Sequence, residues 1–362
     1  SRPADPSAPP SPYGTLAIAM SEIDDAGLTR LYRALLVPRL VEEKMLRLLR
    51  QGRLSKWFSG IGQEAIAVGV VAALDETDIV LPLHRNLGVF TTRGVDLDRL
   101  LRQLLGREGG FTAGRDRSFH FGTLDQGIVG MISHLGAMLP VADGLALAGR
   151  LRGENRVVAV FSGDGGTSEG DFHEALNFAA VYHVPIVFFI QNNGFAISVP
   201  LAKQTAAPAL AYKGVGYGIR SEQVDGNDPV AVLAVLGHAV ESARAGEGPF
   251  LVEAHTYRIE AHTNADDATR YRDDGEVSMW EKRDPITRLE NYLVAEEALT
   301  DDDIGAARER AEHFAGRVRD ALNAEPKVSP LELFEHVYAT PTPQLVEQRG
   351  WLADELDAER EA

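Results

Sequence analysis

The stretch VVAVFSGDGGTSEGDFHEALNFAAVYHVPIVFFIQNN, residues 157–193, holds two apolar runs separated by a segment with helical spacing. The runs at 156–162 and 184–190 predict buried strands, and residues 168–182 carry apolar side chains on one helical face. A strand, a helix of this length and a second strand are typical of two parallel strands in one sheet. We therefore expect a parallel sheet with helices on both faces.

Polar residues follow both strands of this unit. Asp164 lies in a glycine-rich turn after the first strand, and the second strand runs into Asn193. Glycine-rich turns before a helix usually bind phosphate, which a carboxylate would repel. A divalent cation between the two removes the repulsion, because Mg²⁺ takes oxygen ligands and shares them with phosphate. The predicted site is Mg²⁺ on Asp164, Asn193 and a backbone carbonyl just beyond, with a diphosphate near the turn glycines Gly163, Gly165 and Gly166.

Two commoner phosphate motifs do not fit this turn. A dinucleotide fingerprint needs a third glycine where Ser168 stands, and an acidic residue where the second strand ends in Asn193. A P-loop needs a lysine where Asp171 follows Gly170. A nicotinamide dehydrogenase is therefore the weaker alternative. The other alternative is that this segment is a surface turn without a ligand and that the asparagine pair serves only as a cap.

The rest of the chain repeats the alternation of strands and helices. Asp228 is placed to cap a helix that begins at Pro229. The predicted fold class is α/β, a doubly wound mostly parallel sheet flanked by helices, with additional C-terminal helices. Further helices are predicted over residues 28–50, 63–74, 96–105 and 138–152, and further strands over residues 78–83, 219–224 and 250–257. The expected organisation is a Pro-rich N-terminal arm (1–27), a cofactor-binding α/β domain (28–275), a C-terminal helical region (276–340) and an acidic tail (341–362).

Composition limits the function classes. The 362 residues carry a net charge of −17, which argues against nucleic acid and anionic membranes as partners. A phosphorylated ligand would need local positive charge or a metal. The chain has no cysteine, which excludes disulfides and thiolate metal sites. No apolar run approaches the length of a membrane span, and we expect a cytoplasmic protein.

Several segments together resemble one family. They are GQEA at 62–65, GDGGTSEGDFHEALNFAA at 163–180, NNGFAIS at 192–198, VDGNDP at 224–229 and YRIEAHTNADDATRYR at 257–272. The chain resembles the α subunit of thiamine diphosphate-dependent 2-oxo acid dehydrogenases, the decarboxylating first component of their complexes. GYGIRSEQVDGND and WEKRDPITRL are more similar to the branched-chain enzyme than to the pyruvate enzyme. Pyruvate and acetoin enzymes stay open as alternatives, as does a scaffold subunit that has lost the chemistry.

The resemblance implies roles for individual residues. Thiamine diphosphate and Mg²⁺ would be the cofactors, with the carbonyl of Phe195 as the third metal ligand beside Asp164 and Asn193. His262 would be catalytic, in proton transfer as the acyl group passes to lipoamide. His84 stands where relatives often have tyrosine, so its cofactor contact is a departure from the family pattern. The implied cofactor-binding residues are Arg85, His84, Ser133, Leu135, Gly163, Gly165, Gly166, Asn193 and His262, and the implied loop-ordering residues are Arg258, Asp266, Tyr271 and Arg272.

The resemblance also implies partners. A β subunit would supply the pyrimidine-binding domain and the glutamate that activates the cofactor, in an assembly of two α and two β chains. The lipoyl domain of a dihydrolipoyl acyltransferase would receive the acyl group.

Overall fold

The computed structural model of the chain describes residues 16–19, 21, 23–54, 56–116, 118–323 and 329–361. Its centre is a five-stranded sheet in the order β1-β2-β3-β7-β6, and every neighbouring pair is parallel. This confirms the predicted fold class. The strands are β1 Ile79–Leu81, β2 Val158–Gly163, β3 Ile186–Asn192, β6 Arg220–Asp225 and β7 Phe250–His255.

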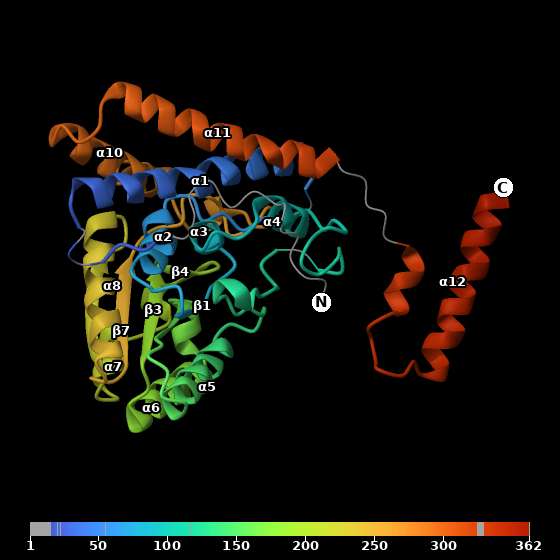
Figure 1. Cartoon of the computed structure of the whole chain (residues 1–362), viewed down its shortest axis with the longest axis horizontal. Coiled ribbons are helices and arrows are strands. Elements are labelled where there is room, and N and C mark those ends of the chain that lie inside the picture. Colours follow the sequence, from blue (N-terminus) through green and yellow to red (C-terminus); the bar gives the residue numbers. More distant parts are fainter. Residues whose placement is uncertain are drawn as a thin grey trace.

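Helices cover both faces of the sheet (Figure 1). The first face packs on α1 Asp25–Arg50, α2 Glu64–Ala72, α3 Leu87–Thr92, α4 Leu97–Leu104 and α8 Pro229–Arg244. The second face packs on α5 Met138–Leu151, α6 Gly170–Tyr182 and α7 Ala211–Val215.

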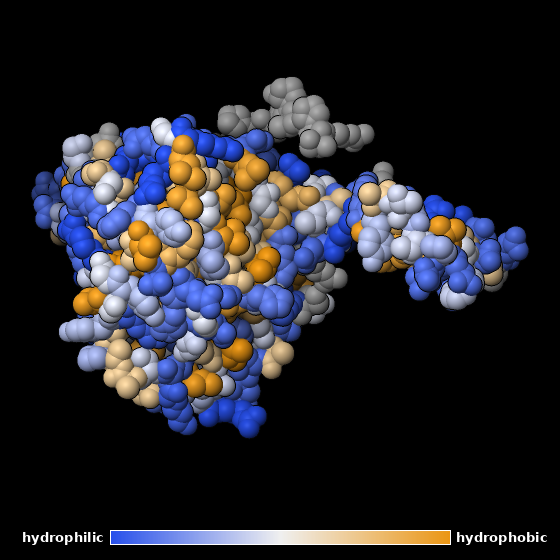
Figure 2. Space-filling view, turned by 90° about the horizontal axis from the view of Figure 1, so that it is seen from below, coloured by the Kyte–Doolittle hydropathy of each residue, from blue (hydrophilic) through white to orange (hydrophobic). Residues whose placement is uncertain are grey.

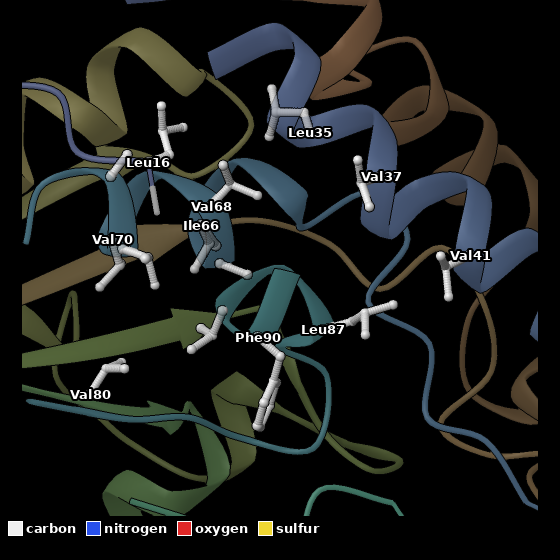
Figure 3. Packing of buried hydrophobic residues seen from close by; sticks show 14 of the residues in the cluster. Leu16, Leu35, Val37, Val41, Ile66, Val68, Val70, Val80, Leu87 and Phe90 are labelled. Atoms are coloured by element: carbon white, nitrogen blue, oxygen red, sulfur yellow. The ribbon is translucent and has the colours of Figure 1, made fainter. Parts of the chain in front are cut away.

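The strands alternate between two hydrophobic cores. In β2, Ala159 and Phe161 belong to the core on the first face, whereas Val158 and Val160 belong to the core on the second. This is why the strands are continuous apolar runs in the sequence, as expected for a parallel sheet buried on both sides. Figure 3 shows part of the first core, where side chains of α1, α2, α3 and β1 meet.

The C-terminal helices α10 Pro285–Ala295 and α11 Asp301–Asn323 pack on α1. Figure 1 shows α11 running alongside α1 at the edge of the molecule. The predicted cap of α8 is confirmed, because Asp228 Oδ1 accepts hydrogen bonds from the main-chain N–H groups of Val230 (3.0 Å) and Ala231 (3.1 Å). Asp284 caps α10 in the same way, and both helices begin with proline.

Several elements differ from the sequence-based prediction. The helix after the Gly-Asp-Gly turn begins at Gly170, because the 3-10 helix η3 Gly165–Ser168 comes first. The helix α3 was not predicted. The acidic tail contains the helix α12 Pro343–Glu361, which stands apart from the body (Figure 1). Most of the predicted N-terminal arm, residues 1–15, 20 and 22, lies outside the described residues. The remaining elements are η2 Leu124–Gln126, β4 Phe195–Ala196, β5 Val199–Pro200, η4 Leu201–Lys203, η5 Ala268–Arg270, α9 Asp274–Glu281 and η6 Pro330–Phe334.

Within the part of the chain that the structure describes, no helix has the length and apolar character needed to cross a membrane.

Candidate functional site

A cavity of about 220 Å³ lies at the carboxyl ends of β2 and β3. In a doubly wound sheet this edge is where ligands bind, since the loops that follow the strands converge there. The cavity brings together most of the predicted site residues. Those that line it are His84, Arg85, Leu135, Gly163, Asp164, Gly165, Gly166, Asn193, Phe195, Arg258 and His262.

Asp164 and Asn193 are neighbours because β2 and β3 pair in parallel, with Gly163 opposite Gln191. Only 1% of Asp164 and 8% of Asn193 is exposed. Burial raises the pKa of Asp164, while a hydrogen bond from Gln204 Nε2 (3.2 Å) and the charge of Arg258 act in the opposite direction. A cation in the cavity would favour the ionised carboxylate further.

The donor set at this edge suits a hard cation. Among the described residues, no three His, Cys, Asp or Glu side chains gather to hold a metal ion. Oxygen ligands would therefore come from one carboxylate, Asp164, from the amide of Asn193 and from the main chain. Neutral and anionic oxygens of this kind are what Mg²⁺ prefers, with the remaining positions filled by phosphate or water.

Two turn glycines leave no room for a side chain. A Cβ at Gly165 would lie 2.6 Å from the Cβ of Ala196, and a Cβ at Gly166 would lie 2.4 Å from Ser162 Oγ. A Cβ at Gly163 would meet nothing within 4 Å. The turn therefore requires glycine at 165 and 166 for its own packing.

Unpartnered polar atoms also point to a polar ligand. Among the described residues, buried side-chain atoms of Gln63, His84, Gln191 and Arg258 lack a hydrogen-bond partner, and all four residues line the cavity. A buried polar atom left without a partner costs about 1–3 kcal/mol, so a cluster of them indicates a missing polar occupant.

Arg85 fixes the orientation of His262. Its Nη1 donates to the carbonyl of Ser59 (2.8 Å), and its Nη2 lies 2.6 Å from Nδ1 of His262. A guanidinium only donates, so Nδ1 accepts and the neutral imidazole carries its proton on Nε2. Burial and the charges of Arg85 and Arg258 lower the pKa of His262 to about 4. The ring is therefore uncharged at neutral pH and presents an Nε2–H donor.

The cavity also holds two buried guanidinium groups. Arg85 is 7% exposed and Arg258 is 2% exposed. Burial, followed by repulsion from Arg258, lowers the pKa of Arg85 to about 9. Two buried guanidinium groups on the lining of one cavity favour an anionic ligand.

The predicted loop-ordering residues lie together behind His262. Asp266 Oδ2 accepts hydrogen bonds from the main-chain N–H of His262 (2.8 Å) and from the hydroxyl of Tyr271 (2.5 Å). Arg258 Nη2 donates to the same hydroxyl (2.6 Å). Arg272 donates to the main-chain carbonyls of Arg258 and Ile259. The loop after β7 is thus tied to the residues that line the cavity.

A second cavity of about 470 Å³ adjoins the first. Ser133 lines this cavity and not the first one. Its hydroxyl lies 3.1 Å from Nε2 of His120, whose Nδ1 lies 3.1 Å from Asp116 Oδ2. The cavity shares four residues with the first and has an apolar wall. The shared residues are His84, Leu135, Ile197 and His262, and the apolar wall contains Trp57, Phe58, Leu104 and Met131.

Sequence reasoning missed several residues of the site. Gln204 supports Asp164 from 40 positions further along the chain, and no local pattern marks it. Gln63 stands inside the GQEA segment that carried the family resemblance, but it was given no role. Gln191 directly precedes the asparagine pair, so its place at a strand end was the signal that could have found it.

The fold and the site define an α/β protein with a cavity at the edge of a parallel sheet, lined by residues that suit an anion and a hard cation. Comparison with known proteins adds the family. The family model described as "Dehydrogenase E1 component" matches residues 32–328. The chain belongs to this family, which implies thiamine diphosphate as its cofactor. The resemblance found in the sequence is thereby confirmed.

Related proteins carry the names of branched-chain enzymes. The "3-methyl-2-oxobutanoate dehydrogenase subunit alpha" of Mycobacterium tuberculosis (strain ATCC 25618 / H37Rv) is 41% identical over 335 residues, which cover 92% of this chain and 89% of the relative. The human "2-oxoisovalerate dehydrogenase subunit alpha, mitochondrial" is 37% identical over 328 residues, 90% of this chain and 74% of the relative. The Dictyostelium discoideum protein of the same name is 36% identical over 332 residues, with 90% and 75% covered.

Proposed function

We propose that this chain is the α subunit of a lipoamide-linked 2-oxo acid dehydrogenase that acts on branched-chain 2-oxo acids, of the 3-methyl-2-oxobutanoate type. One observation carries the proposal. Asp164 and Asn193 share a buried cavity with Arg85, Arg258 and a neutral His262, at the edge of the sheet where ligands bind. The names of the relatives support the branched-chain substrate.

The residues present fit a diphosphate with its metal. Asp164, Asn193 and the carbonyl of Phe195 would hold Mg²⁺, and Arg85 would contact the diphosphate together with the turn glycines. The bound cofactor supplies an electron-accepting ring, which makes loss of carbon dioxide from a 2-oxo acid possible. The protein contributes orientation and positive charge.

His262 is the catalytic residue of the proposal. Because Arg85 occupies Nδ1, the neutral ring presents Nε2–H as a hydrogen-bond donor, and it can give up a proton only after Nδ1 has taken one up. Its position on the lining of both cavities suits proton transfer as the acyl group passes to lipoamide.

The second cavity would hold the substrate. Its wall of Trp57, Leu104 and Met131 suits a branched aliphatic side chain. Lys56 and His120 on the same cavity suit the carboxylate end.

A β subunit is part of the proposal. The face formed by α5, α6 and α7 exposes large apolar side chains, and Figure 2, which views the molecule from below, shows apolar side chains gathered on this side. An apolar face of this kind is typical of a surface that a partner covers. The exposed residues are Val141, Leu151, Val181, Tyr182, Tyr212 and Val215. The β subunit would supply the activating glutamate in an assembly of two α and two β chains. The lipoyl domain of the acyltransferase would approach the loop after β7.

The test uses the chain assembled with its β subunit. We expect calorimetry to show thiamine diphosphate binding that requires Mg²⁺ and is weakened by Asp164→Asn, but not by Asp125→Asn at an exposed position. Initial rates should give the highest kcat/KM for 3-methyl-2-oxobutanoate, above pyruvate and acetoin. The α chain alone should turn over none of the three substrates.

Three outcomes would contradict parts of this proposal. Turnover by the α chain alone would remove the need for a β subunit. A preference for pyruvate or acetoin would reassign the substrate. Absence of Mg²⁺-dependent binding to the assembled protein would favour a scaffold subunit.

A further inference from the structure

A buried carboxylate on α1 reaches the cavity through one short loop. Glu42 is 3% exposed, and its Oε2 accepts hydrogen bonds from Ser59 Oγ (2.8 Å) and from the main-chain N–H of Gly60 (2.8 Å). Trp57 Nε1 lies 3.5 Å from the same oxygen. A single oxygen of Glu42 thus contacts the loop between α1 and α2 at Trp57, Ser59 and Gly60.

The other side of this loop holds the arginine of the site. The carbonyl of Ser59 accepts the hydrogen bond from Arg85 Nη1 (2.8 Å), and Nη2 of the same guanidinium meets His262. A Cβ at Gly60 would lie 2.3 Å from the carbonyl oxygen of Arg85 and 3.0 Å from Glu42 Oε1. The loop therefore lies between Glu42 and Arg85, and a side chain at Gly60 would not fit.

Glu42 has no ion-pair partner among the described residues. The nearby Arg39 pairs instead with Glu64 (2.5 Å) and with Asp284 (2.6 Å). Burial, and then the charge of Glu64, raise the pKa of Glu42 to about 8. At neutral pH the group is thus mostly protonated, and its contribution is the hydrogen bonds that it accepts.

We propose that Glu42 is a positioning residue of the cofactor site, which fixes the Ser59 carbonyl and through it the orientation of Arg85 toward the diphosphate and His262. Glu42 touches neither ligand nor reacting atoms and acts only through the loop. The inference rests on the proposed function, because Arg85 is taken to contact the diphosphate.

Three variants isolate this role in the assembled α and β chains. Glu42→Leu removes the acceptor and keeps a similar volume. Glu42→Gln keeps a carbonyl oxygen for the same three donors, and Glu43→Leu changes an exposed neighbour on the same helix as the matched control. Calorimetry with thiamine diphosphate and Mg²⁺ measures the effect, and the thermal unfolding midpoint shows that each variant is folded.

We expect Glu42→Leu to raise the Kd of the cofactor by roughly tenfold or more, as for other residues that orient a ligating group. Glu42→Gln should stay within about threefold of the wild type at pH 7, because its hydrogen bonds remain. Glu43→Leu should bind like the wild type. In an Arg85→Ala background, Glu42→Leu should add no further loss, since the residue through which it acts is gone.

Wild-type affinity in Glu42→Leu, or a full additional loss in the Arg85→Ala background, would overturn the inference. If the wild type itself does not bind the cofactor, the proposed function fails. The role of Glu42 is then decided in the free protein by NMR of the His262 ring. Glu42→Leu should raise the pKa of His262 from about 4, because Arg85 leaves Nδ1. An unchanged titration would overturn the inference in that case too.

Discussion

At the scale of single residues, the site depends on which atom donates and which accepts. Arg85 leaves His262 only one proton-bearing nitrogen, and Gln204 donates a hydrogen bond to one oxygen of Asp164. The sequence indicated Asp164 through the polar turn that follows a strand, and it indicated Arg85 and His262 through the resemblance to a family. It did not indicate Gln204 or Glu42, because their contacts join positions far apart in the chain and follow no local pattern.

Asp143 is a buried carboxyl group whose two oxygens lack a hydrogen-bond partner among the described residues. Only 1% of the residue is exposed, and burial raises the pKa of Asp143 to about 8. In the unfolded chain the group has its ordinary, lower pKa and loses its proton first. The contribution of Asp143 to the free energy of unfolding is therefore fully present below about pH 4 and is lost as the pH rises toward 8.

We predict that Asp143→Asn stabilises the protein at pH 8 by roughly 1–3 kcal/mol, because the amide stays neutral where the carboxyl group must ionise. The gain should shrink toward zero near pH 4. Urea unfolding at a series of pH values measures the difference, with Asp125→Asn at an exposed position as the control. A gain that does not change with pH would show that the carboxyl group is not the cause.

At the scale of elements, the strands of the sheet were predictable as continuous apolar runs, and the helices that pack on it were predictable from the spacing of their apolar residues. The helix α3 was not, since Leu87–Thr92 has only six residues and contains a glycine. The packing of α3 explains why this helix forms. A Cβ at Gly88 would lie 2.9 Å from the Cβ of Ala67, so α2 and α3 approach each other at a point where only glycine fits. Such a contact between two helices leaves no signal in either segment.

The contribution of one helix cap to stability can be measured at Asp228, the N-cap of α8. Asp228 accepts from two main-chain N–H groups through Oδ1 and pairs with Arg288 through Oδ2 (2.6 Å). We predict that Asp228→Ala lowers the free energy of unfolding by about 1 kcal/mol, because two N–H groups lose their acceptor.

Asp228→Asn serves as the matched comparison. It keeps the cap and loses only a partly exposed ion pair, so it should cost roughly 0.5 kcal/mol or less. Denaturant unfolding of both variants gives the values. Equal losses in the two variants would assign the effect to Arg288 and not to the cap.

At the scale of the whole molecule, the net charge of −17 coexists with a cavity that holds two buried arginines. Composition indicated that a phosphorylated ligand would need local positive charge or a metal. It could not say where, because the local charge depends on strands and loops that meet only after folding. Of the fold, the order of the strands was likewise beyond the sequence, since β7 lies between β3 and β6 although it follows both.

The C-terminal segment that contains η6 and α12 contributes little to the stability of the rest of the chain. The helix α12 has no buried residues, and its neighbour η6 joins the body through an ion pair between Arg115 and Glu332 (3.1 Å). We predict that deletion of residues 341–362 shifts the thermal midpoint of the chain by less than about 2 °C, since little apolar surface is exposed.

The contrasting truncation removes α11 as well. Its buried residues Phe314, Val318 and Leu322 belong to the main core, and each contributes roughly 1.5–3 kcal/mol by burial. Chains that end at residue 300 should therefore unfold far below the full chain or fail to fold. Calorimetry of the two truncations decides between these expectations. A large destabilisation by the shorter deletion would mean that α12 packs on the body in solution.

One carboxylate, Asp266, joins the backbone of His262 to Tyr271 and lies 4.0 Å from Arg258. The order of the loop after β7 and the pKa of the His262 imidazole are therefore thermodynamically linked. Burial and the charges of Arg85 and Arg258 outweigh the opposing charge of Asp266, so the ordered loop makes the His262 ring harder to charge, and a proton added to the ring loosens the loop by the same free energy. Proteolytic cleavage within residues 263–272 should therefore increase as the pH falls.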